Sequence, residues 1–200
     1  MKLTNSHNLI DSTNRQTDTP LVITNEQVLQ VLHWYALYTR PRFEKKVDSL
    51  LQEKGIEVYL PLQTVVRQWS DRKKKVDEPL FRSYVFVHVT AMARSRSLWV
   101  DGVIKLVGFG GKPSIIPDDQ IEALKRFLKE GTILEPCDYL VAGDWVEVTH
   151  GPFQGIKGRL LEKRSLRRFV ISIDAIRQSL AVEIDPALLH KIEPPAAEED

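Results

Sequence analysis

The chain has 200 residues, of which 42% are hydrophobic and 28% are charged, a composition that supports ordinary cores in one large or two small domains. No apolar run approaches the roughly twenty residues needed to cross a bilayer, and the N-terminus is too polar for a secretory signal, so we expect a cytoplasmic monomer without membrane contact. The single cysteine, Cys137, excludes an intramolecular disulfide, and the histidines have no ligand-like spacing, so we expect no metal and no cofactor.

The formal net charge of +1 hides an uneven distribution along the sequence. Residues 33–130 carry 18 Lys and Arg against 12 Asp and Glu, whereas residues 138–193 carry 8 against 8. A basic surplus in one part of the chain favours nucleic acid or an acidic protein surface as a partner of that part.

The predicted elements begin after a polar arm. Residues 1–32 are expected to be disordered or weakly ordered, with a short helix possible over 21–32. The aromatic run from Trp34 to Tyr38 predicts a strand buried on both faces, and the helical spacing that follows Pro41 ends at Gly55.

Strands and helices then alternate as far as residue 130. Strands are predicted over 56–60, 63–69, 84–89 and 103–107, and helices over 91–99 and 117–128. The polar sequence SDRKKK at 70–75 is expected to form the tip of a hairpin. This order predicts an α/β sandwich with a mainly antiparallel sheet over residues 33–130.

The pattern changes after a predicted linker at 131–138. Four short β-rich runs, punctuated by glycines and polar turns, predict a small β-barrel over residues 139–193, with an acidic tail at 194–200. The fold class is therefore α+β, with two domains. Because these runs are rich in β-branched residues and glycines that disfavour helix, we expect a β-structured barrel that stays free of the N-terminal domain.

The sequence EPLFRSYVFV, residues 78–87, carries the first candidate site. Its alternation places Tyr84 and Phe86 on one face of a strand, and Val85 and Val87 on the other. Either helices cover both faces and the aromatic side chains are core, or one face stays open as a protein interaction site.

This segment, together with WYALYTRPRFEKKV, resembles the N-terminal domain of the NusG family of transcription elongation factors, and in particular its specialised RfaH-type paralogues. It is also similar to regulators of polysaccharide operons in Bacteroidetes. The resemblance implies a sheet that binds the clamp helices of RNA polymerase through Phe81, Tyr84 and Phe86. Arg82-Ser83 stands where general members usually carry Pro-Gly, which favours a specialised paralogue.

Basic residues form the second candidate site, for upstream or non-template DNA. Two lie at the start of the first predicted helix and four at the hairpin tip: Arg40, Arg42, Arg72, Lys73, Lys74 and Lys75. Neutralisation of phosphates by such residues gives salt-dependent attraction without sequence preference. A solvated turn is the alternative for the hairpin.

The third candidate site lies in GDWVEVTHGPFQGIKG, residues 143–158, which resembles the KOW motif of NusG C-terminal domains and of some ribosomal proteins. Most of its glycines are expected only to build the barrel, and Gly158 to allow a bend where a side chain would collide. Phe153 and Ile156 are the candidate contacts for a ribosomal protein or termination factor.

These features together predict a processivity or antitermination factor that binds RNA polymerase and recruits a second partner through its KOW domain. The alternative is a KOW-containing RNA-binding protein of the translation machinery, although the basic surplus lies outside the barrel. We expect no enzymatic activity, because no phosphate loop or nucleophile motif is present in the sequence.

Overall fold

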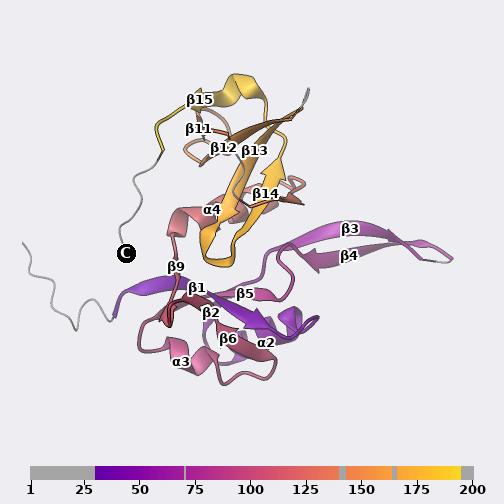
Figure 1. Cartoon of the computed structure of the whole chain (residues 1–200). Helices are drawn as coiled ribbons and strands as arrows, with labels where there is room; N and C mark the ends of the chain where they lie inside the picture. The colour runs from indigo at the N-terminus through magenta and orange to yellow at the C-terminus, as the bar shows by residue number, and fades with distance from the viewer. Residues whose placement is uncertain (1–29, 70, 140–142, 164–165, 195–200) are drawn as a thin grey trace, which may run out of the picture.

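The computed structural model describes residues 30–69, 71–139, 143–163 and 166–194. Two antiparallel sheets dominate it, and helix α4 (Asp118–Lys129) lies between them (Figure 1). Among the described residues, no helix combines the length and the apolar character required to span a bilayer. The predicted helix over 21–32 lies almost entirely outside the described residues, as do residues 195–200 of the predicted tail.

The N-terminal sheet has the strand order β2-β5-β1-β6, and β9 also pairs with β1. All its pairings are antiparallel, as predicted. Its strands are β1 (Leu32–Thr39), β2 (Glu57–Tyr59), β5 (Tyr84–Thr90), β6 (Val103–Leu106) and β9 (Ile115–Ile116). Helix α2 (Glu44–Glu53) begins three residues after Pro41, and α3 (Arg94–Ser97) is a single turn within the longer helix predicted over 91–99.

Both faces of this sheet are apolar, because side chains alternate along its two central strands. One set packs with Val47 and Leu51 of α2. This set consists of Tyr35, Leu37, Val85, Val87 and Val89. The opposite set includes Trp34, Ala36 and Phe86, and it packs against α4 and the second sheet.

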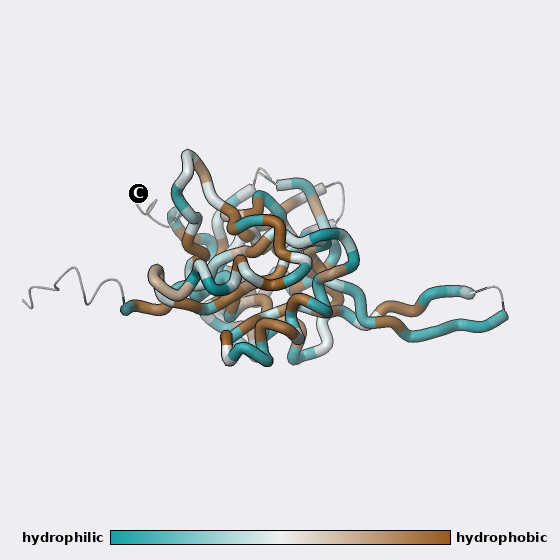
Figure 2. Tube along the Cα trace, turned by 90° about the horizontal axis from the view of Figure 1, so that it is seen from below, coloured by the Kyte–Doolittle hydropathy of each residue, from teal (hydrophilic) through white to brown (hydrophobic). Residues whose placement is uncertain are grey.

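A long hairpin projects from the body of the molecule (Figures 1 and 2). It is formed by β3 (Leu62–Gln68) and β4 (Lys73–Pro79), which pair with each other and not with the N-terminal sheet. The basic run expected at the tip therefore lies partly within β4. A second, much smaller hairpin, β7 (Gly108–Phe109) with β8 (Lys112–Pro113), occupies the predicted turn cluster GFGGKP.

The C-terminal sheet has six strands in the order β10-β14-β13-β12-β11-β15. Its strands are β10 (Glu135–Cys137), β11 (Asp144–Val148), β12 (Lys157–Lys163), β13 (Leu166–Ile173), β14 (Gln178–Val182) and β15 (Leu189–Lys191). The four predicted runs correspond to β11 to β14. The structure adds β10, which lies inside the predicted linker and pairs with β14, and β15, which pairs with β11.

Gly158 lies in β12 close to its neighbouring strand β13, and the lack of space beside it explains why this position has no side chain. A Cβ atom built there would approach the carbonyl oxygen of Val170 to 2.5 Å and the ring of Phe169 to 2.6 Å. Such distances are too short for any side chain, as expected from the sequence.

Candidate protein and nucleic-acid interfaces

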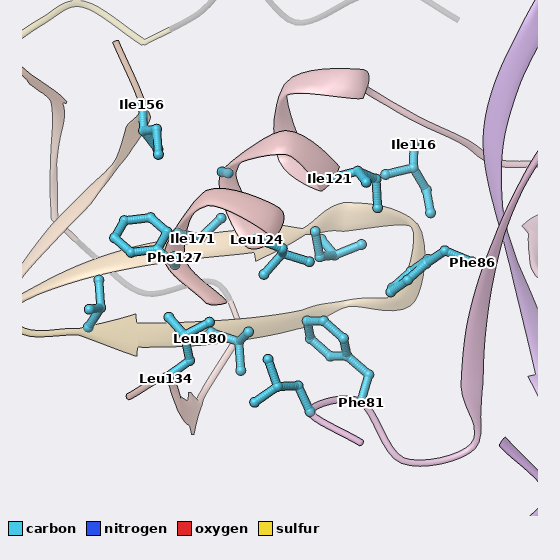
Figure 3. Close-up of a cluster of buried hydrophobic side chains, with 14 of the residues drawn as sticks. Phe81, Phe86, Ile116, Ile121, Leu124, Phe127, Leu134, Ile156, Ile171 and Leu180 are labelled. Atoms are coloured by element: carbon cyan, nitrogen blue, oxygen red, sulfur yellow. The ribbon is translucent and has the colours of Figure 1, made fainter. Parts of the chain in front are cut away.

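The aromatic face of the N-terminal sheet is covered in this structure. Phe81 is 1% exposed and Phe86 is fully buried, whereas Tyr84 is half-buried beside Tyr38. Figure 3 shows the Phe81 and Phe86 rings pointing toward α4 and the hairpin formed by β13 and β14. Burial, and secondly the neighbouring Tyr38, raises the pKa of the Tyr84 hydroxyl above its ordinary value.

One continuous hydrophobic cluster joins the two sheets. It includes Phe86 from β5, Leu124 and Phe127 from α4, and Phe169 and Leu180 from the C-terminal sheet. The C-terminal segment is β-structured, as predicted, but it is not free of the N-terminal sheet. Local sequence pattern showed that the aromatic face is apolar, and it could not show which part of the chain covers that face.

The end of α4 closest to the KOW-like loop makes the tightest contact between the sheets. The Phe127 ring stacks on Phe153 with 4.2 Å between centroids. The Arg126 guanidinium donates hydrogen bonds to the carbonyl oxygens of Pro152 and Gln154, including a 3.1 Å bond from Nε to Pro152. Ile156 is buried in the same cluster. Phe153 therefore contacts α4, and Ile156 is buried in the cluster that α4 shares, whereas the sequence predicted both as contacts for a separate partner.

Polar contacts support the same arrangement at two other places. Gln120 of α4 donates to Asp174 of the β13–β14 connection at 3.1 Å, and Tyr139 donates to the other oxygen of Asp174 at 3.0 Å. Gln63, at the base of the long hairpin, accepts from the Leu134 backbone N–H at 2.8 Å and donates to its carbonyl at 3.3 Å. The predicted linker, residues 131–138, is therefore bound through Leu134 to the base of the long hairpin.

The turn that carries the aromatic residues has an unusual backbone. Ser83 has a φ of 65°, in the left-handed region that favours glycine. Its N–H donates to the buried carboxylate of Glu44 at 2.7 Å, and its carbonyl accepts from Thr39 N–H at 2.8 Å. Glu44 thus fixes the turn between Phe81 and Tyr84. In the sequence, the only sign of this role is an acidic residue at the start of a helix.

Arg40 and Arg42 lie in the turn before α2, not within the helix as expected. Arg40 pairs with Asp101 at 3.4 Å, and Lys46 pairs with the same carboxylate at 2.7 Å. The Lys46 hydrogen bond, followed by its charge and that of Arg40, holds the pKa of Asp101 below its ordinary range. Arg42 is exposed with a φ of 68°.

The remaining four basic candidates lie on the projecting hairpin and are exposed: Arg72, Lys73, Lys74 and Lys75. Within the described residues, none of the three lysines is within 4.0 Å of a carboxylate oxygen, whereas Arg72 lies 3.9 Å from Asp71. Sequence reasoning overlooked Trp69, which ends the predicted strand beside this run and is 48% exposed. No ion pair among the described residues joins the hairpin to the turn containing Arg40 and Arg42, so the structure presents two separate basic surfaces.

The structure thus has two apolar surfaces, one on each large sheet, that cover each other. It also has a basic arm, the β3–β4 hairpin. Within the described part of the chain, no group of three or more His, Cys, Asp or Glu side chains could hold a metal ion. Cys137 is half-buried, and burial raises the pKa of its thiol. The elements define a mixed α/β fold with mostly antiparallel sheets and few helices.

Comparison with known proteins shows which proteins the chain is similar to. The family model described as "Transcription termination factor nusG" matches residues 32–125. Proteins named "Transcription termination/antitermination protein NusG" are similar over most of the chain. The one from Vibrio parahaemolyticus is 27% identical over 175 residues, covering 80% of this chain and 96% of the relative. The one from Pseudomonas aeruginosa is 26% identical over 176 residues, covering 80% and 98%.

A solved structure titled "Domain interaction in Thermotoga maritima NusG" has a TM-score of 0.46 and 24% identity, and the match covers 81% of this chain and 98% of that one. The chain is similar to the NusG family over residues 32–125.

Proposed function

We propose that this protein promotes processive transcription by binding the clamp helices of RNA polymerase through its N-terminal domain, residues 33–130. The aromatic face with Phe81, Tyr84 and Phe86 is the proposed contact surface. The observation that carries this proposal is that Phe81 and Phe86 are buried against another sheet of the same chain. A face covered in this way can exchange its present cover for a partner, provided that the two sheets separate.

The C-terminal part, residues 139–193, is proposed to be a KOW domain that recruits a ribosomal protein or a termination factor through Phe153 and Ile156. The contact of Phe153 with α4 supports this assignment, because its ring already stacks on an aromatic ring, Phe127, outside its own sheet. The same separation of the sheets would free both surfaces. Residues 131–138 then remain a connection, in which β10 contributes one edge pairing in the closed arrangement.

The basic surfaces are proposed to bind upstream or non-template DNA through Arg40, Arg42 and the hairpin residues. The exposure of these side chains supports the proposal, since phosphate contacts need cations that are accessible to the solvent. Such contacts would hold the factor beside the transcribed DNA without reading its sequence. Binding promotes elongation only if the factor has higher affinity for the active polymerase than for the paused one.

Co-purification of the tagged full-length protein with RNA polymerase tests the proposal. We expect polymerase subunits in the eluate, and we expect Tyr84→Ala to reduce their yield, because an interface aromatic typically contributes about 2 kcal/mol or more. Phe109→Ala is the matched control, since Phe109 is exposed on β7 outside both apolar surfaces.

Circular dichroism of each variant separates loss of contact from loss of fold. Recovery of ribosomal subunits in place of polymerase would reject this function and support an RNA-binding role in translation. Phe81→Asp is unsuitable as the test, because it would place a carboxylate in the cluster that joins the two sheets.

A further inference from the structure

Trp69 and Lys74 form a paired aromatic and cationic group near the end of the long hairpin. Trp69 follows the last residue of β3. Its backbone N–H donates a hydrogen bond of 2.8 Å to the backbone carbonyl of Arg72, which closes the end of the ribbon. The Lys74 ammonium lies 5.2 Å from the centroid of the Trp69 ring. A cation at this distance is attracted to the face of the ring and orients it.

Strand register determines which side chains share this surface. Arg67 faces Lys74 across the ribbon, and Trp69 lies two residues beyond Arg67 on the same face. Arg67 is held by Glu78 through two hydrogen bonds of 2.7 Å, so its charge is largely neutralised. Lys73 and Lys75 occupy the opposite face of the ribbon. The Trp69 ring therefore has the Lys74 cation on its own face of the ribbon and the Lys73 and Lys75 cations on the opposite face.

Packing within the hairpin does not explain the Trp69 ring. A two-stranded ribbon has no core of its own, and the ring stays 48% exposed on an arm that reaches far from both sheets (Figure 2). Val66, in the outer half of β3, is also exposed. The ring thus remains accessible to a ligand with a flat face.

Unpaired nucleic acid has the chemistry that this surface fits. Its bases expose flat faces that stack on aromatic side chains, and its phosphates are attracted to the neighbouring lysines. In a duplex the base faces are already stacked, so an indole ring could use only the grooves or the backbone. An acidic protein segment would satisfy the lysines but would leave the aromatic face without a matching group.

We propose that the tip of the β3–β4 hairpin is a stacking site for single-stranded nucleic acid, in which Trp69 stacks on an unpaired base and Lys74, on the same face, contacts a flanking phosphate, while Lys73 and Lys75 attract the strand from the opposite face through their charge. This inference rests on the proposed nucleic-acid role of the hairpin and adds to it a preference for single strands and a residue that supplies that preference.

Fluorescence anisotropy with the full-length protein tests the site. The probes are a labelled oligothymidylate of about 12 nucleotides, an abasic strand with the same number of phosphates, and a duplex of the same length. Trp69→Ala should weaken binding of the oligothymidylate about tenfold and leave the abasic strand and the duplex unchanged, because only the thymidylate offers bases for stacking. The salt dependence should not change, since no phosphate contact is removed.

Two variants serve as controls. Trp69→Phe keeps an aromatic face and should retain most of the affinity, whereas Trp99→Ala removes an 82% exposed ring outside the hairpin and should have no effect. Equal weakening of the thymidylate and abasic strands by Trp69→Ala would show that the ring only shapes the hairpin, and it would overturn the stacking site.

The charge-reversed variant with Lys73→Glu, Lys74→Glu and Lys75→Glu separates this inference from the broader proposal. Loss of binding in this variant, with no effect of Trp69→Ala, would leave the nucleic-acid role standing and remove the stacking site. Unchanged binding in both variants would reject the nucleic-acid role of the hairpin and the stacking site together. Tighter binding of a polyglutamate peptide than of oligothymidylate at equal ionic strength would assign the arm to an acidic protein and reject the stacking site.

Discussion

Glu44 and Ser83 show how a single contact positions a whole surface. Ser83 adopts a backbone conformation that costs a residue with a side chain roughly 1–2 kcal/mol, and Glu44 offsets this cost by accepting its N–H in a buried site. The pair links the start of α2 to the turn before β5. The departure from Pro-Gly at Arg82-Ser83, noted in the sequence, thus has a local structural counterpart in a serine with positive φ.

We predict that Glu44→Ala lowers the free energy of unfolding by about 1–3 kcal/mol, because it leaves the buried Ser83 N–H without an acceptor. Ser83→Gly should preserve or raise stability, by up to about 1 kcal/mol, because glycine adopts positive φ without a steric penalty. Urea denaturation of the full-length protein measures both effects. Glu53→Ala, an exposed change at the other end of α2, is the control. Equal midpoints for Glu44→Ala and Glu53→Ala would show that the Glu44 contact contributes nothing.

At the scale of single elements, the long hairpin combines basic residues with an acidic residue that restrains one of them. Glu78 forms two hydrogen bonds with Arg67, and these bonds are the main reason why the pKa of Glu78 lies below its ordinary value. Since this pKa is lowered by folding, the pair is intact above the ordinary glutamate pKa and is lost as the pH falls through the lower folded value. Near neutral pH, Arg67 is therefore withheld from other anions.

We predict that Glu78→Gln increases the affinity of the hairpin for single-stranded nucleic acid at neutral pH. The substitution removes one negative charge and releases Arg67, which can then contact one further phosphate. The slope of log affinity against log salt should steepen by about 0.7, the value for one added contact on a single strand. Anisotropy titrations at several salt concentrations provide the measurement, with Glu53→Gln as the control. A slope that stays the same would mean that Arg67 does not reach a phosphate.

The elements themselves were largely predictable because their signals are local. The continuous aromatic and apolar run from Trp34 to Tyr38 predicted β1, alternation in residues 84–89 predicted β5, and helical spacing predicted α2 and α4. Strand β10 was missed because Glu135-Pro136-Cys137 has no alternation of its own and becomes a strand by pairing with β14. The roles of Arg126 and Glu44 were also hidden, since each depends on a partner distant in sequence.

At the scale of the whole molecule, α4 is the element that holds the two sheets together. It buries Ile121, Leu124 and Phe127 in the shared cluster, and Arg126 binds the loop that carries Phe153. Both proposed partner surfaces therefore lie in one interface. A single equilibrium between closed and open arrangements would control both, and the apparent affinity for each partner would fall with the closed fraction.

That shared equilibrium predicts how a substitution at Arg126 changes binding of both partners. Arg126→Ala removes the hydrogen bonds to Pro152 and Gln154 and leaves every proposed contact residue in place. If their loss weakens the closed arrangement by about 1 kcal/mol, the apparent affinities for RNA polymerase and for the C-terminal partner should both rise about fivefold, and by the same factor. Lys129→Ala, an exposed substitution in the last turn of the same helix, should change neither.

Hydrogen exchange at the backbone amides of Gly151 and residues 153–156 shows whether Arg126→Ala has opened the interface. Faster exchange together with tighter polymerase binding would support a closed state that competes with polymerase. Faster exchange with unchanged polymerase binding would mean that polymerase does not use the covered face with Phe81 and Phe86. A rise in affinity for only one partner would separate the two surfaces, because one opening reaction cannot favour one of them alone.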